Sequence, residues 1–578
     1  MKILLEKHNT FNFNLPYKVE RFARIGILVI AFLVIAYCIW TLDRGLEITD
    51  EAYYLLLAMH ADSVKFYISA QQWITSGFWQ ITGSITRFRA AGMVLLLASS
   101  TLLSLGIFSA CKRFDLVADR FEFKSLVISG SAVGAMLYAS TINLSPCYNL
   151  LASVGAYAAA GMVLLASNRS NFTSKYVLYA LAGCAVGVEV VCKPSAGVST
   201  LALLIVWVAS FEHSRLDKVF GLMTMVFGAL TFAIILLLVN TTISDAKQAV
   251  EHGVQLFRMV QVETVGERLI RYFIEYCKSI LITLRAFAVP ILAMIVYVNR
   301  RRIFFAILSL VALLIIIKQK RYYLGGWNAD YFLVPPISIY AMLFLALIVS
   351  IPIWNKNRST LTLFAGLIAL PYSVAIGTGN ALFTQVVDSF APWAALIAVL
   401  MVAHQRDDFN KLITSLVGLC FIMIIALRIF TSSLSSYHMF LPLEKQDQVV
   451  IVGNLGKIKV DTSTFKFITD LKTAAEACDI APGAPFIGLY NIPGVALVLQ
   501  ATPLMTPWLN NREQAKFVLD RMRLEALHST IVALRMGRND ISPPMPQQLA
   551  TFPLGYRYCG MATYPYEQQK IQIWQSRV

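Results

Sequence analysis

Two adjacent carboxylates, Asp50 and Glu51, are the side chains in this sequence best suited to acid–base chemistry. They follow the first long apolar stretch, residues 24–42, so they lie beside a membrane if that stretch spans one. Neighbouring carboxylates repel each other, which raises the pKa of one and produces a general base. The pair suits equally well the solvated start of a helix, with Asp50 as N-cap. The pair alone leaves both interpretations open.

Aromatic and basic residues surround this pair in the sequence. Tyr53 and Tyr54 follow it and favour a helix lying in the membrane interface, where they would contact a substrate. Arg87 and Arg89 end the same loop. They are either anchors at a helix end or an anion site that faces the carboxylates.

Two further polar sites interrupt apolar sequence. Tyr148 and Asn149 follow a tight turn at 145–147, where they would hydrogen-bond a polar ligand, although proline alone explains the turn. Lys193 is costly at membrane depth unless it faces a wet cavity or a partner. Glu189, four residues earlier, would be that partner on one helix face.

Later in the chain, Lys320 and Arg321 belong to a basic and aromatic cluster. Such cations beside a membrane bind either a phosphate group or lipid headgroups. Asn380 ends a glycine-rich break in another apolar run, which suits hydrogen bonding to a saccharide or a plain turn.

Composition places these residues in a polytopic membrane protein. Of 578 residues, 57% are hydrophobic and only 14% are charged. Apolar runs of spanning length centre near about thirteen positions, at residues 33, 100, 133, 157, 184, 203, 230, 289, 310, 341, 368, 396 and 421. The net charge of +16 is spread over short loops, which is an orientation signal and not a nucleic-acid site.

The apolar runs and the charges between them predict three parts. Residues 1–23 form a cytoplasmic tail, 24–430 a transmembrane domain with long outer loops at 43–89 and 240–279, and 431–578 an extracytoplasmic α/β domain. The α/β prediction rests on strand-like runs at 449–452, 486–490, 530–534 and 571–574, which alternate with helical runs at 463–477 and 512–527. That last part holds only Cys478 and Cys559, which either pair or stay free. No cysteine or histidine spacing suits a metal, so we expect neither metal nor other cofactor.

Together these motifs resemble the type C (GT-C) glycosyltransferases that use polyprenyl-phosphate sugars. The similarity is to the branch of lipid A aminoarabinose transferases and protein O-mannosyltransferases. It rests on Asp50 to Tyr54, the Arg87/Arg89 pair, the turn 145–149 and the run ending in Lys193 and Pro194. The resemblance implies a multi-pass protein of the plasma (inner) membrane whose essential acid is Asp50, with Glu51 as its partner.

The implied activity is inverting transfer of a sugar from a polyprenyl-phosphate donor to a glycan, lipid or protein acceptor of the cell envelope, such as lipopolysaccharide. Lys320, Arg321, Lys193, Arg87 and Arg89 would then hold the donor phosphate. Two other classes stay open, a secondary transporter and a membrane protein of envelope assembly. Consumption of donor without an ion gradient separates them from an enzyme.

Overall fold

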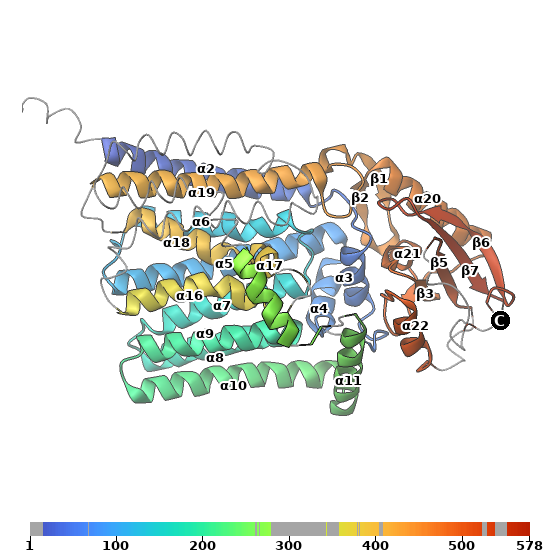
Figure 1. Ribbon diagram of the computed structural model, residues 1–578, viewed down its shortest axis with the longest axis horizontal. Helices are drawn as coiled ribbons and strands as arrows, with labels where there is room; N and C mark the ends of the chain where they lie inside the picture. The colour runs from blue at the N-terminus through green and yellow to red at the C-terminus, as the bar shows by residue number, and fades with distance from the viewer. Residues whose placement is uncertain are drawn as a thin grey trace, which may run out of the picture.

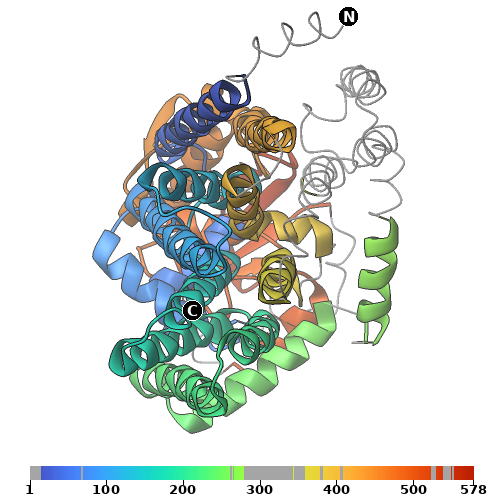
Figure 2. The same cartoon turned by 90° about the vertical axis from the view of Figure 1, so that its left-hand side faces the viewer.

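A computed structural model describes residues 15–66, 69–260, 263–264, 266–278, 343, 358–377, 380, 382–403, 408–522, 529–537, 549 and 552–577. Apolar helices run side by side along most of its length, and a sheet-containing region lies at one end (Figure 1). Figure 2 shows the helices end-on. They are α2 Leu15–Thr41, α5 Ile85–Arg113, α6 Phe121–Met136, α7 Tyr148–Ala166, α8 Phe172–Cys192, α9 Pro194–Phe211, α10 Arg215–Asn240, α16 Arg358–Ala375, α18 Ala391–Val402 and α19 Asp408–Ser432.

Seven helices in the described ranges are long and apolar enough to cross a membrane, namely α2, α5, α7, α8, α9, α10 and part of α19. The prediction of thirteen spans is therefore not confirmed. Three of the predicted runs coincide with α6, α16 and α18, which have 16, 18 and 12 residues and are not among the seven. Three more, centred near residues 289, 310 and 341, lie outside the described residues.

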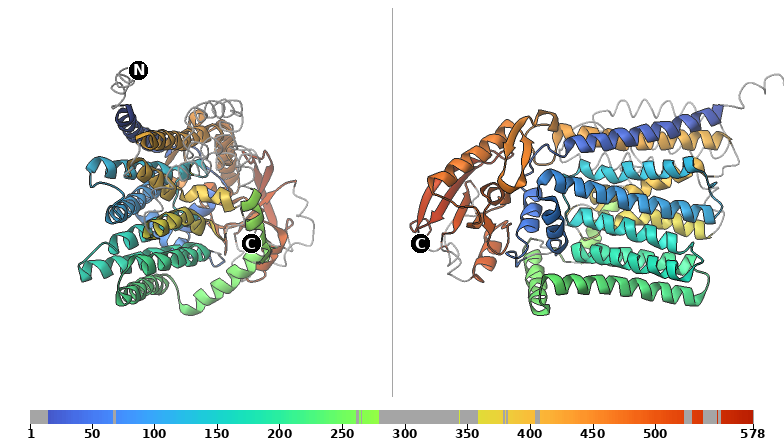
Figure 3. Two further views of the ribbon diagram at one scale, coloured as in Figure 1. Left: turned by 60° about the vertical axis from the view of Figure 1, so that its left-hand side comes forward. Right: turned by 180° about the vertical axis from the view of Figure 1, so that it is seen from behind.

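Three further helices lie at the end of the bundle that faces the sheet-containing region. They are α3 Asp50–Met59, α4 Gln72–Thr82 and α11 Ile243–Val260, and the last runs across the end of α10 (Figure 1). Helix α3 is buried along most of its length, from Glu51 to Ala58. Its tyrosines predicted a helix in the membrane interface, and that placement stays a prediction. Figure 3 (right) shows the short helices after α2 between the bundle and the sheet-containing region.

The C-terminal region is an α/β unit, as the alternation of short apolar runs predicts. Its five-stranded sheet has the order β4-β3-β5-β7-β6, with β3, β4 and β5 parallel and β7 antiparallel to both of its neighbours. Strands β1 and β2 form a separate antiparallel pair. The elements are β1 Gln448–Ile451, β2 Lys457–Val460, α20 Thr462–Ala477, β3 Pro485–Leu489, α21 Pro493–Leu499, β4 Thr502–Pro503, α22 Arg512–Leu519, β5 Ile531–Arg535, β6 Tyr556–Thr563 and β7 Lys570–Ser576.

This region and the loop after α2 share one hydrophobic core. Ile48 and Leu55 pack in the same buried cluster as Phe467 of α20 and Ile573 of β7. Two hydrogen bonds reinforce the contact, since the backbone N–H of Gly494 and the side-chain hydroxyl of Tyr564 both donate to the carbonyl of Ile48, at 2.9 and 3.0 Å. The first loop therefore folds as part of the C-terminal region.

Cys478 and Cys559 form a disulfide that joins the end of α20 to β6, with their α-carbons 5.4 Å apart. The bridge closes 81 residues, so losing it should destabilise the folded C-terminal region by about 2–4 kcal/mol. We expect neither thiol to react with a maleimide in denatured, unreduced protein. Changing both to serine should lower the unfolding midpoint. Labelling of both cysteines without a reductant would contradict the bridge.

Candidate active site

The start of α3 is held by a carboxylate that sequence analysis missed. Glu47 is buried, and its two oxygens accept from the backbone N–H of Thr49 and of Glu51, at 2.8 and 2.7 Å. A carboxylate in this place satisfies amides that the helix itself leaves unpaired. Glu47 therefore fixes where α3 begins, and Asp50 becomes its first residue. An acid three residues before the Asp50–Glu51 pair was the available signal.

Glu51 and Arg89 form a buried ion pair, and each side chain is only 1% exposed. The Nε and Nη2 of Arg89 donate to the two carboxylate oxygens at 2.7 and 2.6 Å. Its remaining N–H groups donate to the carbonyls of Leu42, Arg44 and Gly45. All five guanidinium donors are thus directed at protein atoms. Arg89 has none left for a donor phosphate, so that hypothesis is corrected.

The predicted turn at 145–149 approaches the same ion pair. Ser145 and Asn143 donate to the Glu51 carboxylate, both at 2.6 Å. Gly92 permits this approach, because a β-carbon there would lie 1.9 Å from the carbonyl oxygen of Leu144. Glu51 is therefore neutralised and fully bonded, which makes it a structural residue and not a second catalytic acid.

Asp50, by contrast, is half-buried and has no cationic ion-pair partner among the described residues. Burial and the nearby Glu47 carboxylate raise its pKa to about 6, while a hydrogen bond from Tyr437 and the proximity of His438 act in the opposite direction. The carboxylate repulsion predicted for this site is present, but its source is Glu47 and not Glu51. A carboxylate with a pKa of about 6 has the strength that proton transfer near neutral pH requires.

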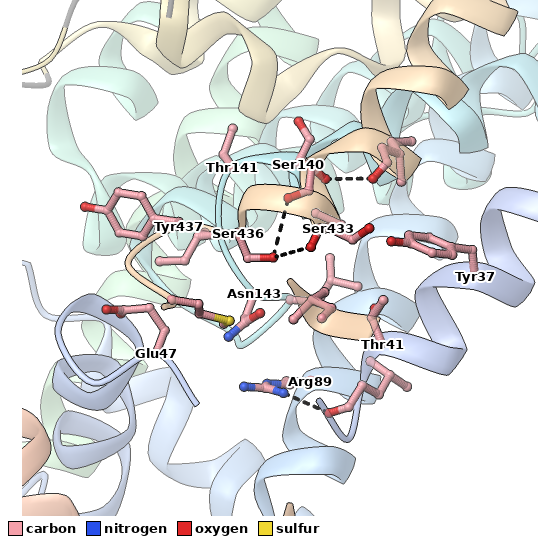
Figure 4. Close-up of a pocket in the computed structure, with 18 residues that line it drawn as sticks. Tyr37, Thr41, Glu47, Arg89, Ser140, Thr141, Asn143, Ser433, Ser436 and Tyr437 are labelled. Atoms are coloured by element: carbon pink, nitrogen blue, oxygen red, sulfur yellow. Dashed lines mark hydrogen bonds between the residues drawn. The ribbon is translucent and has the colours of Figure 1, made fainter. Parts of the chain in front are cut away.

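Tyr437 and His438 reach this site from the segment after α19, almost 390 residues away in the chain. Figure 4 shows Tyr437 beside Glu47. Burial and the Asp50 carboxylate raise the pKa of Tyr437, so its hydroxyl stays protonated and donates. The ring nitrogen Nδ1 of His438 lies 2.8 Å from the Thr49 hydroxyl and 3.6 Å from the Glu47 carboxylate. No local pattern in the sequence indicated these two residues.

Changing Tyr437 to phenylalanine should reduce the fraction of Asp50 that is ionised at a given pH near 6. The hydrogen bond stabilises the carboxylate, so its loss raises the Asp50 pKa by up to about one unit. We expect the acid limb of the rate profile to move to higher pH, with little change at pH 8. Tyr558→Phe, an exposed site in β6, is the control. An unmoved acid limb in Tyr437→Phe would contradict the contact.

The predicted aromatic contacts are mainly packing contacts. Tyr53 meets the ring of Trp508 in the C-terminal region, with centroids 5.0 Å apart. Tyr54 is 6% exposed and meets Tyr148 edge-on at 5.9 Å. These rings form a continuous layer beside Asp50 that ties α3 to α7 and to the C-terminal region. Whether one of them also contacts a substrate remains a proposal.

Lys193 is buried at the junction of α8 and α9 and contacts another predicted residue. Its ammonium donates to the carbonyl of Val374 at 2.8 Å and to Oδ1 of Asn149 at 3.3 Å. The expected alternative, an ion pair with Glu189, is not formed, and Glu189 instead accepts from Thr200 at 2.8 Å. Asn149 neighbours Tyr148, so Lys193 lies behind the aromatic layer and not directly at Asp50.

The structure does not bring the remaining predicted residues to Asp50. Arg87 is exposed whereas Arg89 is buried, because residues two apart on a helix point in nearly opposite directions. Asn380 is exposed and lies beyond α16. Lys320 and Arg321 fall outside the described residues. Within the part of the chain that the structure covers, no group of three or more histidine, cysteine or acidic side chains is placed to hold a metal ion.

Comparison with known proteins gives matches in structure alone. No protein-family model and no curated protein sequence matches the chain. An oligosaccharyltransferase from Archaeoglobus fulgidus is 12% identical over 88% of this chain and 67% of its own, with a TM-score of 0.45. The arabinosyltransferase EmbB from Mycobacterium smegmatis is 13% identical over 72% of this chain and 42% of its own, with a TM-score of 0.34.

A third match is the arabinofuranosyltransferase AftD from mycobacteria, 12% identical over 96% of this chain and 40% of its own, with a TM-score of 0.39. All three matches are glycosyltransferases, and this is the class that the sequence resemblance indicates. Identities of 12 to 13% and TM-scores below 0.5 carry no argument about what this chain binds or transfers. The case for function therefore rests on the site itself.

Proposed function

We propose that this chain is an inverting membrane glycosyltransferase. In this proposal it moves a sugar from a polyprenyl-phosphate donor to an acceptor on the extracytoplasmic side, at the bundle end that carries Asp50. The observation that supports it best is the contrast between two adjacent carboxylates. Glu51 is paired with Arg89, whereas Asp50 has a pKa of about 6 and accepts a hydrogen bond from Tyr437. In this proposal Glu51 has a structural role and Asp50 transfers the proton.

The reaction follows from this assignment. Asp50 accepts the proton of an acceptor hydroxyl while the hydroxyl oxygen bonds to the anomeric carbon of the sugar. The bond from that carbon to the phosphate oxygen breaks, and polyprenyl phosphate leaves with both bonding electrons. Attack from the face opposite the phosphate inverts the anomeric centre. A donor whose carrier is a lipid also accounts for a base at the end of an apolar helix bundle.

The cations that would hold the leaving phosphate are proposed in part from the sequence. Arg89 is excluded by its five protein contacts. Lys320 and Arg321, outside the described residues, remain sequence-based candidates. The prediction for Lys193 requires its ammonium, which lies behind the aromatic layer, to exchange the carbonyl of Val374 for the phosphate when donor binds.

The test is donor consumption by the purified full chain in lipid nanodiscs. The probe is the lipid-linked sugar fraction extracted from native membranes, and the readout is release of polyprenyl phosphate by mass spectrometry. We expect release without any ion gradient and loss of release in Asp50→Asn. Gradient-dependent movement of solute with no bond cleavage would replace the proposal with a transporter.

A further inference from the structure

A small pocket is lined by Glu47 and Tyr437, two of the residues that surround Asp50. Its walls come from the end of α2, from the turn after the 3-10 helix η1 Leu137–Ser140, and from the segment that follows α19 (Figure 4). The volume is about 40 Å³. A water-sized group needs about 10–15 Å³ by this measure, so the pocket admits roughly three such groups and not a whole sugar ring.

The walls are unusually rich in hydroxyl groups, and most of these hydroxyls have already donated their proton. Thr41 donates to the carbonyl of Cys38, Ser432 to that of Ile429 and Ser433 to that of Phe430, at 2.7 to 2.8 Å. Thr141 and Ser436 likewise direct their protons at protein oxygens. A hydroxyl that donates to protein keeps its oxygen lone pairs, so these groups offer acceptors to a ligand.

The positive charge in the wall is not available to a ligand either. Arg89 lines the pocket, but its five N–H groups are bonded to Glu51 and to backbone carbonyls. The other charged group in the wall is the Glu47 carboxylate, which repels anions. A phosphate would therefore meet mainly lone pairs and a like charge, with no free cation among the described residues of the wall, whereas phosphate recognition depends on cations and several donors.

Ser140 differs from the serine and threonine hydroxyls described above. It is 2% exposed and lines the pocket, and in the described part of the chain neither its Oγ nor the Tyr37 hydroxyl in the same wall has a hydrogen-bond partner. A buried hydroxyl without a partner costs about 1–3 kcal/mol relative to a bonded one. That cost is recovered when a ligand group enters the pocket and bonds to it.

We propose that this pocket binds hydroxyl groups on one edge of the transferred sugar and excludes its phosphate. The inference rests on the proposed function and adds to it the part of the donor that this end of the site recognises. The sugar edge enters the acceptor-rich pocket beside Tyr437, while the phosphate lies on another side of Asp50. Ser140 and Ser433 are then residues that determine sugar specificity, and neither takes part in proton transfer.

Two variants test this with a matched control. Ser140→Ala and Ser433→Ala each remove one hydroxyl from the pocket. Ser99→Ala removes a buried α5 hydroxyl that donates, as that of Ser433 does, to the carbonyl three residues earlier, here Leu96 at 3.1 Å. We expect the donor KM to rise about tenfold in each pocket variant, as loss of one ligand hydrogen bond predicts. The kcat and the acid limb of the pH profile should stay unchanged. Pocket variants that match Ser99→Ala would overturn the proposal.

A binding measurement separates failure of this inference from failure of the proposed function. Saturation-transfer NMR with methyl arabinofuranoside and methyl mannopyranoside, each added to the full chain in nanodiscs, requires no turnover. We expect a signal from at least one glycoside that is lost in Ser433→Val, whose side chain fills the pocket, and kept in Ser99→Ala. Inorganic phosphate should not compete. Competition by phosphate, or no Ser433-dependent signal from either glycoside, would show that the pocket does not bind sugar hydroxyls.

Discussion

Asp50→Asn is expected to lower the rate of sugar transfer by about 10²–10⁴-fold, the usual contribution of a general base. Asparagine keeps the size of the side chain and its hydrogen bond to Tyr437, but it accepts no proton at neutral pH. The protein should still fold, because Glu47 and not Asp50 holds the start of α3. The measurement is polyprenyl phosphate release at saturating donor, together with the unfolding midpoint.

The control for this prediction is Asp62→Asn, an exposed carboxylate in the same loop, which should leave the rate unchanged. The pH profile gives an independent check. A base with a pKa of about 6 is ionised above pH 6, so the wild-type rate should fall about tenfold per unit as the pH drops below 6. Near-normal turnover in Asp50→Asn would remove Asp50 from the mechanism.

Arg89→Ala is expected to destabilise the folded chain by about 3–5 kcal/mol, because it leaves the Glu51 carboxylate buried without a cation. The carbonyls of Leu42, Arg44 and Gly45 lose their donors as well. Arg89→Lys should recover only part of the stability, since an ammonium has three N–H groups and lacks the planar fork. The readout is the unfolding midpoint in detergent and protease resistance of residues 43–89.

Arg87→Ala is the matched control, two residues earlier and exposed, and should change stability by less than about 0.5 kcal/mol. Glu51→Leu combined with Arg89→Met should restore much of the lost stability, because an apolar pair removes both buried charges. If Arg89→Ala instead kept the midpoint of Arg87→Ala and weakened only donor binding, the phosphate-binding hypothesis for Arg89 would return.

Sequence patterns located the acidic loop, the turn at 145–149 and four strands of the C-terminal region, because each depends on local spacing. β3, for example, was expected at 486–490 and is found at Pro485–Leu489. The helix expected at 512–527 is described only over Arg512–Leu519. The prediction is wrong for residues 520–522, which form a turn after the helix, and residues 523–527 lie outside the described range.

The roles of the two adjacent acids could not be predicted from their neighbours. Glu51 is a structural residue because Arg89, Asn143 and Ser145 converge on it, and those contacts arise only when α3, α5 and the turn before α7 pack together. Asp50 owes its raised pKa to burial and to Glu47, and part of its hydrogen bonding to Tyr437. Burial and contacts across nearly 390 residues are tertiary properties that no local spacing encodes.

The shared core of the first loop and the C-terminal region has a consequence for biosynthesis. The Tyr564 hydroxyl binds the carbonyl of Ile48 across 516 residues of sequence, and Ile48 lies two residues before Asp50. Translation must therefore pass Tyr564 before Ile48 and the start of α3 acquire the surroundings described here. A nascent chain halted after α19 would contain the helix bundle and Asp50 but not the residues that complete this core. Under the proposed function, such a chain would be inactive.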